Sequence, residues 1–211
     1  MRFKKCIILL LLSSLSYSSY AQHWSDDLEL ELNYGPGLIL PEYRFFNLIS
    51  RDYTKTYEFS IRKNTYGKDE WQQLYNYPSY GLRFVYSDLG NPNVLGEVWG
   101  IYPYFQVTIL DFNRFKVYNQ FGLGYSRVSK KFDLENNYLN VAIGSNGNMH
   151  FNTRFVASYE LSPKVSINTS LSLDHFSNGN TAEPNLGINY VSWLGGVSYT
   201  LGQKQEKIEP G

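Results

Sequence analysis

The most constraining feature of this sequence is an alternation of apolar and polar residues that recurs along most of its length. It is clearest over residues 28–34, where Leu and Tyr alternate one by one with Glu and Asn until Gly35-Pro36-Gly37 ends the run. Successive side chains of a β-strand point to opposite faces, so this period of two indicates strands with one apolar and one polar face. The pattern recurs in about eight segments, which cover residues 28–34, 57–62, 80–87, 99–109, 115–126, 149–160, 165–177 and 191–201.

The connections between these segments alternate between short and long. Short turns are expected near Asn113 and Pro163, and a long polar loop is expected over residues 129–148. An even number of strands with short turns on one side is typical of outer-membrane barrels. The sequence therefore predicts an all-β fold, an eight-stranded antiparallel transmembrane β-barrel of the bacterial outer membrane. Residues 64–78 lack clear alternation and fit either a short helix or an ordered turn.

The polar face of the predicted strands carries charges of both signs. Because side chains just fill the interior of an eight-stranded barrel, we expect these charges to form a paired interior network and not a conducting pore. His150 shares the interior face of its strand and is expected to be a satisfied interior residue. A soluble lipocalin-like barrel with its apolar face inward is the rival architecture. The charged positions are Glu29, Glu31, Glu58, Arg62, Arg83, Arg154 and Glu160.

The N-terminal segment has the pattern of a secretory signal peptide over residues 1–21. A basic start precedes an apolar run, and Ala21 ends a small-residue motif before a predicted cut at Gln22. Removing the signal's three basic residues from the 19 Lys and Arg leaves 16 against 19 Asp and Glu, a net charge of −3. Neither this charge nor any basic run supports a nucleic-acid partner. We expect a barrel domain over residues 22–203 and a polar C-terminal tail over residues 204–211.

One predicted strand ends in polar residues on its apolar face. His175 and Ser177 are two residues apart, so both share the face of Leu173 and the apolar residues before it. On the next strand, Asn189 shares the apolar face of Trp193. A serine hydroxyl becomes a strong nucleophile when a base takes its proton, and that base needs an orienting partner. These positions predict nucleophilic chemistry at a membrane surface.

Two motifs in this region resemble those of a known family. His-x-Ser-Asn over residues 175–178, followed by Pro-Asn-x-Gly-Ile over residues 184–188, is similar to the motifs of the lipid A 3-O-deacylases of the PagL type. That resemblance implies an eight-stranded outer-membrane barrel that removes an ester-linked acyl chain from the 3-position of lipid A. It also implies roles for individual residues: general base for His175, nucleophile for Ser177, oxyanion donor for Asn178, and support of the site for Asn185 and Gly187.

The third catalytic position departs from the family, which has Glu where this chain has Asn189. An amide can orient a histidine, but it cannot offset the charge of an imidazolium. Asp174 and Glu183 are alternative carboxylates. Asp174 is expected to point into the barrel and Glu183 to lie on a loop, so Asn189 is preferred.

If both chain ends are periplasmic, the site meets the outer leaflet and its lipopolysaccharide. No metal or organic cofactor is implied, since the sequence has no ligand cluster with metal spacing. A homodimer is left open. Two functions compete with deacylation of lipid A: a non-catalytic barrel that acts as an adhesin or structural protein, and an esterase or phospholipase with another lipid substrate.

Overall fold

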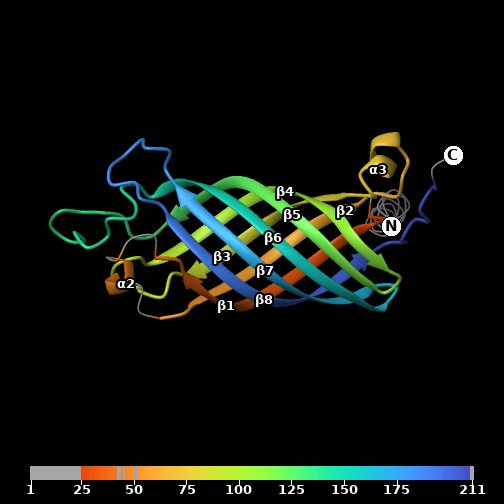
Figure 1. Cartoon of the computed structure of the whole chain (residues 1–211), viewed down its shortest axis with the longest axis horizontal. Helices are drawn as coiled ribbons and strands as arrows, with labels where there is room; N and C mark the ends of the chain where they lie inside the picture. The colour runs from red at the N-terminus through yellow and green to blue at the C-terminus, as the bar shows by residue number, and fades with distance from the viewer. Residues whose placement is uncertain (1–24, 42–43, 45, 50–51, 210–211) are drawn as a thin grey trace, which may run out of the picture.

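The computed structural model describes residues 25–41, 44, 46–49 and 52–209. Eight antiparallel strands follow one another around a closed barrel, and β8 pairs with β1 to complete it (Figure 1). The predicted fold class is therefore confirmed. The strands are β1 (Leu28–Ile39), β2 (Thr54–Asn64), β3 (Ser79–Asp88), β4 (Glu97–Phe112), β5 (Phe115–Val128), β6 (Gly147–Ser162), β7 (Val165–Ser177) and β8 (Ile188–Leu201).

Side chains alternate between the outer wall and the interior, as the sequence pattern predicts. On β7, Leu171 is 56% exposed on the outer wall, whereas Asp174 is 1% exposed inside the barrel. The outer wall is rich in Leu, Phe, Tyr and Trp, and polar residues make up much of the interior. This is the reverse of a soluble lipocalin-like barrel and matches a barrel whose outer wall faces lipid.

The two ends of the barrel differ in their connections. At the terminal end, where β1 begins and β8 ends, short turns join β4 to β5 and β6 to β7. The connection 65–78 also lies at this end. Of the short helix and the ordered turn that the sequence left open here, the structure contains the short helix, α3 (Glu70–Leu74). The opposite, loop end carries the long connections and the short helix α2 (Phe46–Ile49) (Figure 1). Among the described residues, no helix is long and apolar enough to cross a bilayer.

The prediction that the first strand ends at Gly35-Pro36-Gly37 is wrong, because β1 continues to Ile39. At Gly35 a Cβ would lie 2.0 Å from the carbonyl oxygen of Trp193, so glycine allows the backbone of β8 to come close. Pro36 stays in register opposite Lys55 of β2. These glycines serve close strand packing and do not form a turn.

The strands are strongly staggered around the barrel. The register followed from Glu29 once around the barrel returns to β1 at Ile39, ten residues further along. A stagger of this kind tilts the strands against the barrel axis. The path runs through Arg62, Gly81, Tyr104, Gly122, Asn152, Asp174 and Tyr190.

Ion pairs occupy the middle of the interior, as the sequence predicts. Glu58 accepts hydrogen bonds from Arg83 at 2.5 Å and from both terminal nitrogens of Arg154 at 2.7 Å. Arg83 also contacts Glu31 at 2.9 Å. The network extends toward the terminal end through Arg62 and Glu29, which are 2.5 Å apart.

The seventh predicted member of this network is placed elsewhere. Glu160 lies near the terminal end of β6 and pairs with Lys204 of the C-terminal segment at 2.6 Å. It has the interior parity of its strand, but it lies too close to the end to reach the central arginines. The same C-terminal segment is held by Tyr66, whose carbonyl accepts the backbone N–H of Ile208. The predicted signal peptide lies outside the described residues.

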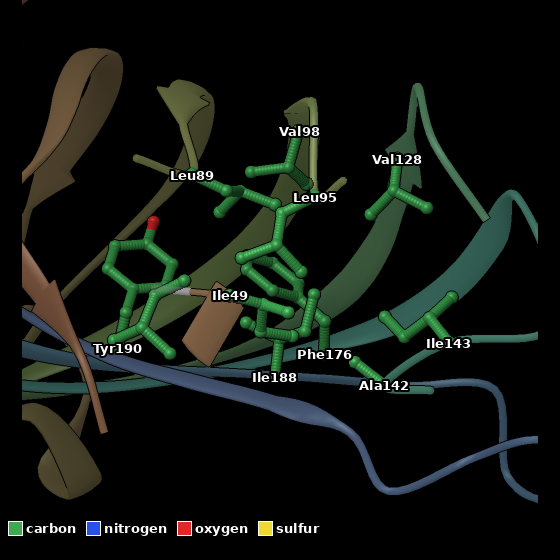
Figure 2. Close-up of a cluster of buried hydrophobic side chains, with 11 residues drawn as sticks. Ile49, Leu89, Leu95, Val98, Val128, Ala142, Ile143, Phe176, Ile188 and Tyr190 are labelled. Atoms are coloured by element: carbon green, nitrogen blue, oxygen red, sulfur yellow. The ribbon is translucent and has the colours of Figure 1, made fainter. Parts of the chain in front are cut away.

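An apolar cluster closes the interior at the loop end (Figure 2). It joins residues at the ends of strands with residues from the long connections, and all of them are buried. Phe176 and Ile188 belong to it, and each is the direct chain neighbour of a candidate site residue. The members are Ile39, Ile49, Leu89, Leu95, Val98, Val128, Ala142, Ile143, Phe176, Ile188 and Tyr190. We call this set the loop-end cluster.

Candidate active site

His175 and Asn189 face each other across β7 and β8. They form a directly opposed pair in the register, and both side chains lie on the outer wall. The Nδ1 atom of His175 lies 2.6 Å from the Oδ1 atom of Asn189. Because an amide oxygen only accepts, this contact requires a proton on Nδ1 and leaves Nε2 as the basic atom of the neutral ring.

Ser177 is the last residue of β7, on the same wall as His175. Its hydroxyl exchanges hydrogen bonds with the side-chain amide of Asn185, with Oγ 3.3 Å from Oδ1 and 3.2 Å from Nδ2. The backbone N–H of Gly179 also points to this hydroxyl at 3.3 Å. Asn185 therefore holds the serine hydroxyl in the present arrangement.

Asn178 organises the turn that follows Ser177. Its Nδ2 atom donates to the carbonyl of Ala182 at 2.8 Å, and its Oδ1 atom accepts the backbone N–H of Thr181 at 3.2 Å. Its own backbone N–H donates to Oδ1 of Asn185 at 3.0 Å. The side chain is thus engaged within the loop, while the backbone N–H lies beside Ser177.

Gly187 lies against the histidine ring. A Cβ at this position would come within 3.0 Å of Cε1 of His175, and the φ angle of +78° is one that residues with side chains rarely adopt. Both observations explain a glycine here. Its backbone N–H donates to the carbonyl of Ala142 at 3.0 Å.

The long connection 129–146 supports the site from the side. Ile143 forms an isolated β-bridge with Asn185, and its side chain is fully buried in the loop-end cluster. Asn185 is therefore fixed to a part of the chain that is anchored in apolar packing. The sequence pattern did not indicate this support, because residues 141–143 lack the alternation of a barrel strand.

The two alternative carboxylates are placed as the sequence predicts. Asp174 points into the barrel, where its Oδ1 atom lies 2.7 Å from Nε2 of His150 and accepts a hydrogen bond from Asn152 at 2.8 Å. His150 is fully buried, as expected, but only its Nε2 atom is paired, because its Nδ1 atom has no hydrogen-bond partner among the described residues. Glu183 lies on the exposed connection after β7. Among the described residues, Asn189 is the side chain that contacts Nδ1 of His175.

Apolar side chains surround the site on the outer wall. Phe151 is opposite His175 on β6, and Met149 is opposite Ser177. Further along the same wall, the indole N–H of Trp193 donates to the hydroxyl of Thr169 at 2.7 Å. The polar groups of the site therefore stand at the edge of a hydrocarbon-like surface.

A family assignment follows from the sequence around this site. Residues 55–198 match the family model described as lipid A 3-O-deacylase (PagL). The chain belongs to the PagL family. The matched range contains all the candidate site residues of this PagL-family chain, namely His175, Ser177, Asn178, Asn185, Gly187 and Asn189.

Solved structures with the same architecture include neisserial surface protein A (NspA), with a TM-score of 0.54 and 12% identity over 83% of this chain and 97% of that one. They also include the outer-membrane enzyme PagL, with a TM-score of 0.50 and 17% identity over 80% of this chain and 97% of that one. Ail of Yersinia pestis has a TM-score of 0.43 and 10% identity over 82% and 98%. Among curated proteins, no sequence matches this PagL-family chain.

Sequence identities this low show a shared fold but do not show a shared function. The same barrel occurs in a surface protein and in an enzyme, so the fold alone does not decide between a catalytic and a non-catalytic role. That decision depends on the chemistry of the site.

Proposed function

We propose that this protein is an outer-membrane serine esterase that removes the acyl chain ester-linked at the 3-position of lipid A. The observation that carries the proposal is the 2.6 Å contact between Nδ1 of His175 and Oδ1 of Asn189, with Ser177 next on the same wall. Family membership supports the choice of lipid A as the substrate. The site would face the outer leaflet, where this lipid is found.

The first step is activation of the serine. With its Nδ1 proton donated to Asn189, the ring of His175 offers Nε2 to the hydroxyl proton of Ser177. The hydroxyl now bonded to Asn185 turns toward His175, and its oxygen attacks the ester carbonyl. Catalytic hydrogen bonds commonly tighten only when substrate is bound, so this rotation fits the observed arrangement.

Stabilisation of the oxyanion falls to the turn after β7. An oxygen atom, Oδ1 of Asn185, already lies 3.3 Å from the Ser177 hydroxyl and 3.0 Å from the backbone N–H of Asn178. This N–H therefore reaches the space beside the nucleophile, where the ester oxygen would develop charge. Because the Asn178 side chain is engaged by the loop, its proposed oxyanion role belongs to its backbone N–H.

Collapse of the tetrahedral intermediate breaks the bond between the carbonyl carbon and the sugar oxygen. The imidazolium of His175 gives its Nε2 proton to that leaving oxygen, and the acyl group stays on Ser177. Water, activated by the same nitrogen, then hydrolyses the acyl-enzyme and releases a fatty acid. The departing chain would lie along the outer wall over Leu173 and Val191, which are opposed to each other in the register.

The decisive experiment is mass spectrometry of lipid A incubated with the purified, refolded barrel. We expect loss of the 3-linked acyl chain with the native sequence, and loss of that activity by several orders of magnitude in Ser177→Ala and His175→Ala. Ser166→Ala, at the other end of β7, is the matched control and should act like the native protein. Heat-dependent gel migration would verify that each variant is folded.

The alternatives give different products in the same experiment. Unchanged lipid A and unchanged phospholipids would indicate a non-catalytic barrel. Fatty acid released from phospholipids in preference to lipid A would indicate a phospholipase.

A further inference from the structure

A second feature of the outer wall begins near the site and is not used in the steps above. A groove of about 870 Å³ crosses the wall from β5 over β4, β3, β2 and β1 to β8. Its volume is in the range of sites that bind small organic ligands. Its outward-facing lining residues include Leu32, Tyr34, Tyr57, Phe59, Phe84, Tyr86, Trp99, Ile101, Tyr125, Arg127 and Val197.

Aromatic rings form one side of this groove. The rings of Tyr34 and Tyr57 lie 4.7 Å apart, and those of Tyr86 and Trp99 lie 4.5 Å apart. These four residues follow one another in register across β1 to β4. Rows of Tyr and Trp at this position are typical of the membrane–water interface, where acyl chains end and head groups begin.

Arg127 is the basic residue in the lining of the groove. It lies opposite Trp99, one residue from the end of β5, and its side chain is exposed. Among the described residues, none forms an ion pair or hydrogen bond with its guanidinium. The nearby carboxylate of Glu97 lies against the hydroxyl of Tyr86. A guanidinium at the interface without a protein partner is suited to bidentate binding of a phosphate.

The register places Arg127 close to the proposed nucleophile. Ser177 is opposite Met149 on β6, and Met149 is opposite Tyr125 on β5, two residues from Arg127. Two strand spacings across the sheet and two residues along it amount to roughly 12 Å between the Cα atoms of Ser177 and Arg127. Gly147 is the residue opposite Arg127 on β6, and the side chain of Tyr125 lies over it, since a Cβ at Gly147 would come within 2.7 Å of the Tyr125 hydroxyl. The exposed side chain of Met149 lies opposite Ser177 on the same strand.

From this arrangement we propose that Arg127 binds a phosphate of the lipid A substrate while the groove holds acyl chains that are not cleaved. The inference rests on the proposed function and adds an orientation to it. A phosphate on Arg127 places the sugar backbone over the side chains of Tyr125 and Met149 and directs one ester toward Ser177. The cationic end and the apolar length of the groove match the two parts of a phosphorylated glycolipid.

Binding can be measured without turnover in the full-length Ser177→Ala barrel, refolded in detergent. Lipid A with two phosphates, and the same lipid without phosphates, are titrated against tryptophan fluorescence, to which Trp99 of the groove contributes. A charge-assisted pair of this kind corresponds to about a tenfold or greater difference in Kd between the two lipids. Adding Arg127→Gln should remove that difference, and Arg127→Lys should restore part of it.

Arg114→Gln, an exposed arginine in the turn at the terminal end, is the matched control and should keep the full preference for phosphate. The inference is overturned if Arg127→Gln keeps that preference, or if phosphatidylglycerol displaces lipid A as well as lipid A displaces itself. In the active protein, Arg127→Gln should raise KM for phosphorylated lipid A more than it lowers kcat.

The two proposals fail in different ways. Phosphate-dependent binding through Arg127 without any ester cleavage would contradict the proposed activity but support the proposed binding site. Normal cleavage of lipid A with an unchanged KM in Arg127→Gln would contradict the proposed binding site but support the proposed activity.

Discussion

At the scale of single residues, Asn189 is the position where the proposed site departs from the family pattern. Its amide can fix the tautomer of His175, but it carries no charge to balance the imidazolium formed during attack. The 2.6 Å contact supports the orienting part of this proposed role. The electrostatic part is what the family's glutamate would add.

Substitutions at Asn189 separate these two contributions. Asn189→Leu removes the acceptor with little change of volume and should lower kcat about tenfold or more. Asn189→Glu keeps an acceptor, adds a charge, and should retain or raise kcat. Initial rates on lipid A with the refolded variants provide the measurement. A native rate in Asn189→Leu would show that this residue orients nothing.

Gly187 allows a second test at this scale. Gly187→Ala would place a methyl group 3.0 Å from Cε1 of His175, in a backbone conformation with φ +78°. Gly179 has a φ of +64° with nothing within 4 Å of an added Cβ, so Gly179→Ala imposes similar backbone strain, about 1–2 kcal/mol, without the contact. We expect similar losses of stability in both variants and a much larger loss of kcat in Gly187→Ala. Equal rates would mean that the ring of His175 moves aside freely.

At the scale of elements, the connection 129–146 extends the candidate site beyond β7 and β8, the two strands that carry His175, Ser177 and Asn189. Ile143 is buried in the loop-end cluster and bridges to Asn185, which holds the Ser177 hydroxyl. Packing at this end should therefore affect the position of Ser177, the proposed nucleophile, through Asn185.

Truncation of Ile143 should show this connection. Ile143→Ala removes buried methyl groups and should destabilise the loop-end cluster by about 2–5 kcal/mol. Limited proteolysis should then cut residues 129–146 faster, and kcat should fall with it. Leu134→Ala changes an 80% exposed side chain of the same connection and serves as the control. Faster proteolysis with an unchanged kcat would separate this loop from catalysis.

Alternation allowed the strands and their faces to be predicted, including the outward placement of His175, Ser177 and Asn189. It gave no information on the support of the site. Ala142 and Ile143 lie in a connection without periodicity, and their contacts with Gly187 and Asn185 depend on how two loops fold over the same end. The length of β1 was underestimated, because glycines that permit close strand packing look like turn residues in the sequence.

At the scale of the whole molecule, buried charges fill the middle of the barrel and apolar packing fills its loop end. Glu58 is the centre of the ion pairs, with Arg83 and Arg154 both bound to it. Removing one partner of a buried pair leaves an uncompensated charge, which is strongly destabilising.

A comparison of two glutamates tests this arrangement. Glu58→Gln should lower the free energy of unfolding by about 3–5 kcal/mol, because two buried arginines lose their carboxylate. Glu160→Gln breaks a pair with the exposed Lys204 and should cost about 0–1 kcal/mol. Urea unfolding in lipid vesicles, followed by heat-dependent gel migration, would measure both. Similar midpoints for the two variants would contradict the assigned role of the network.

For the proposed esterase, the outward position of Ser177 means that the lipid substrate reaches it by sideways diffusion in the plane of the membrane. The relevant concentration is then the mole fraction of the lipid at the surface and not its amount per litre. Diluting lipid A with inert detergent at constant total lipid A should slow the reaction, whereas diluting the whole suspension with buffer should leave the rate per enzyme unchanged. The barrel would behave as a two-dimensional catalyst, whose rate depends on the mole fraction of lipid A in the leaflet around it.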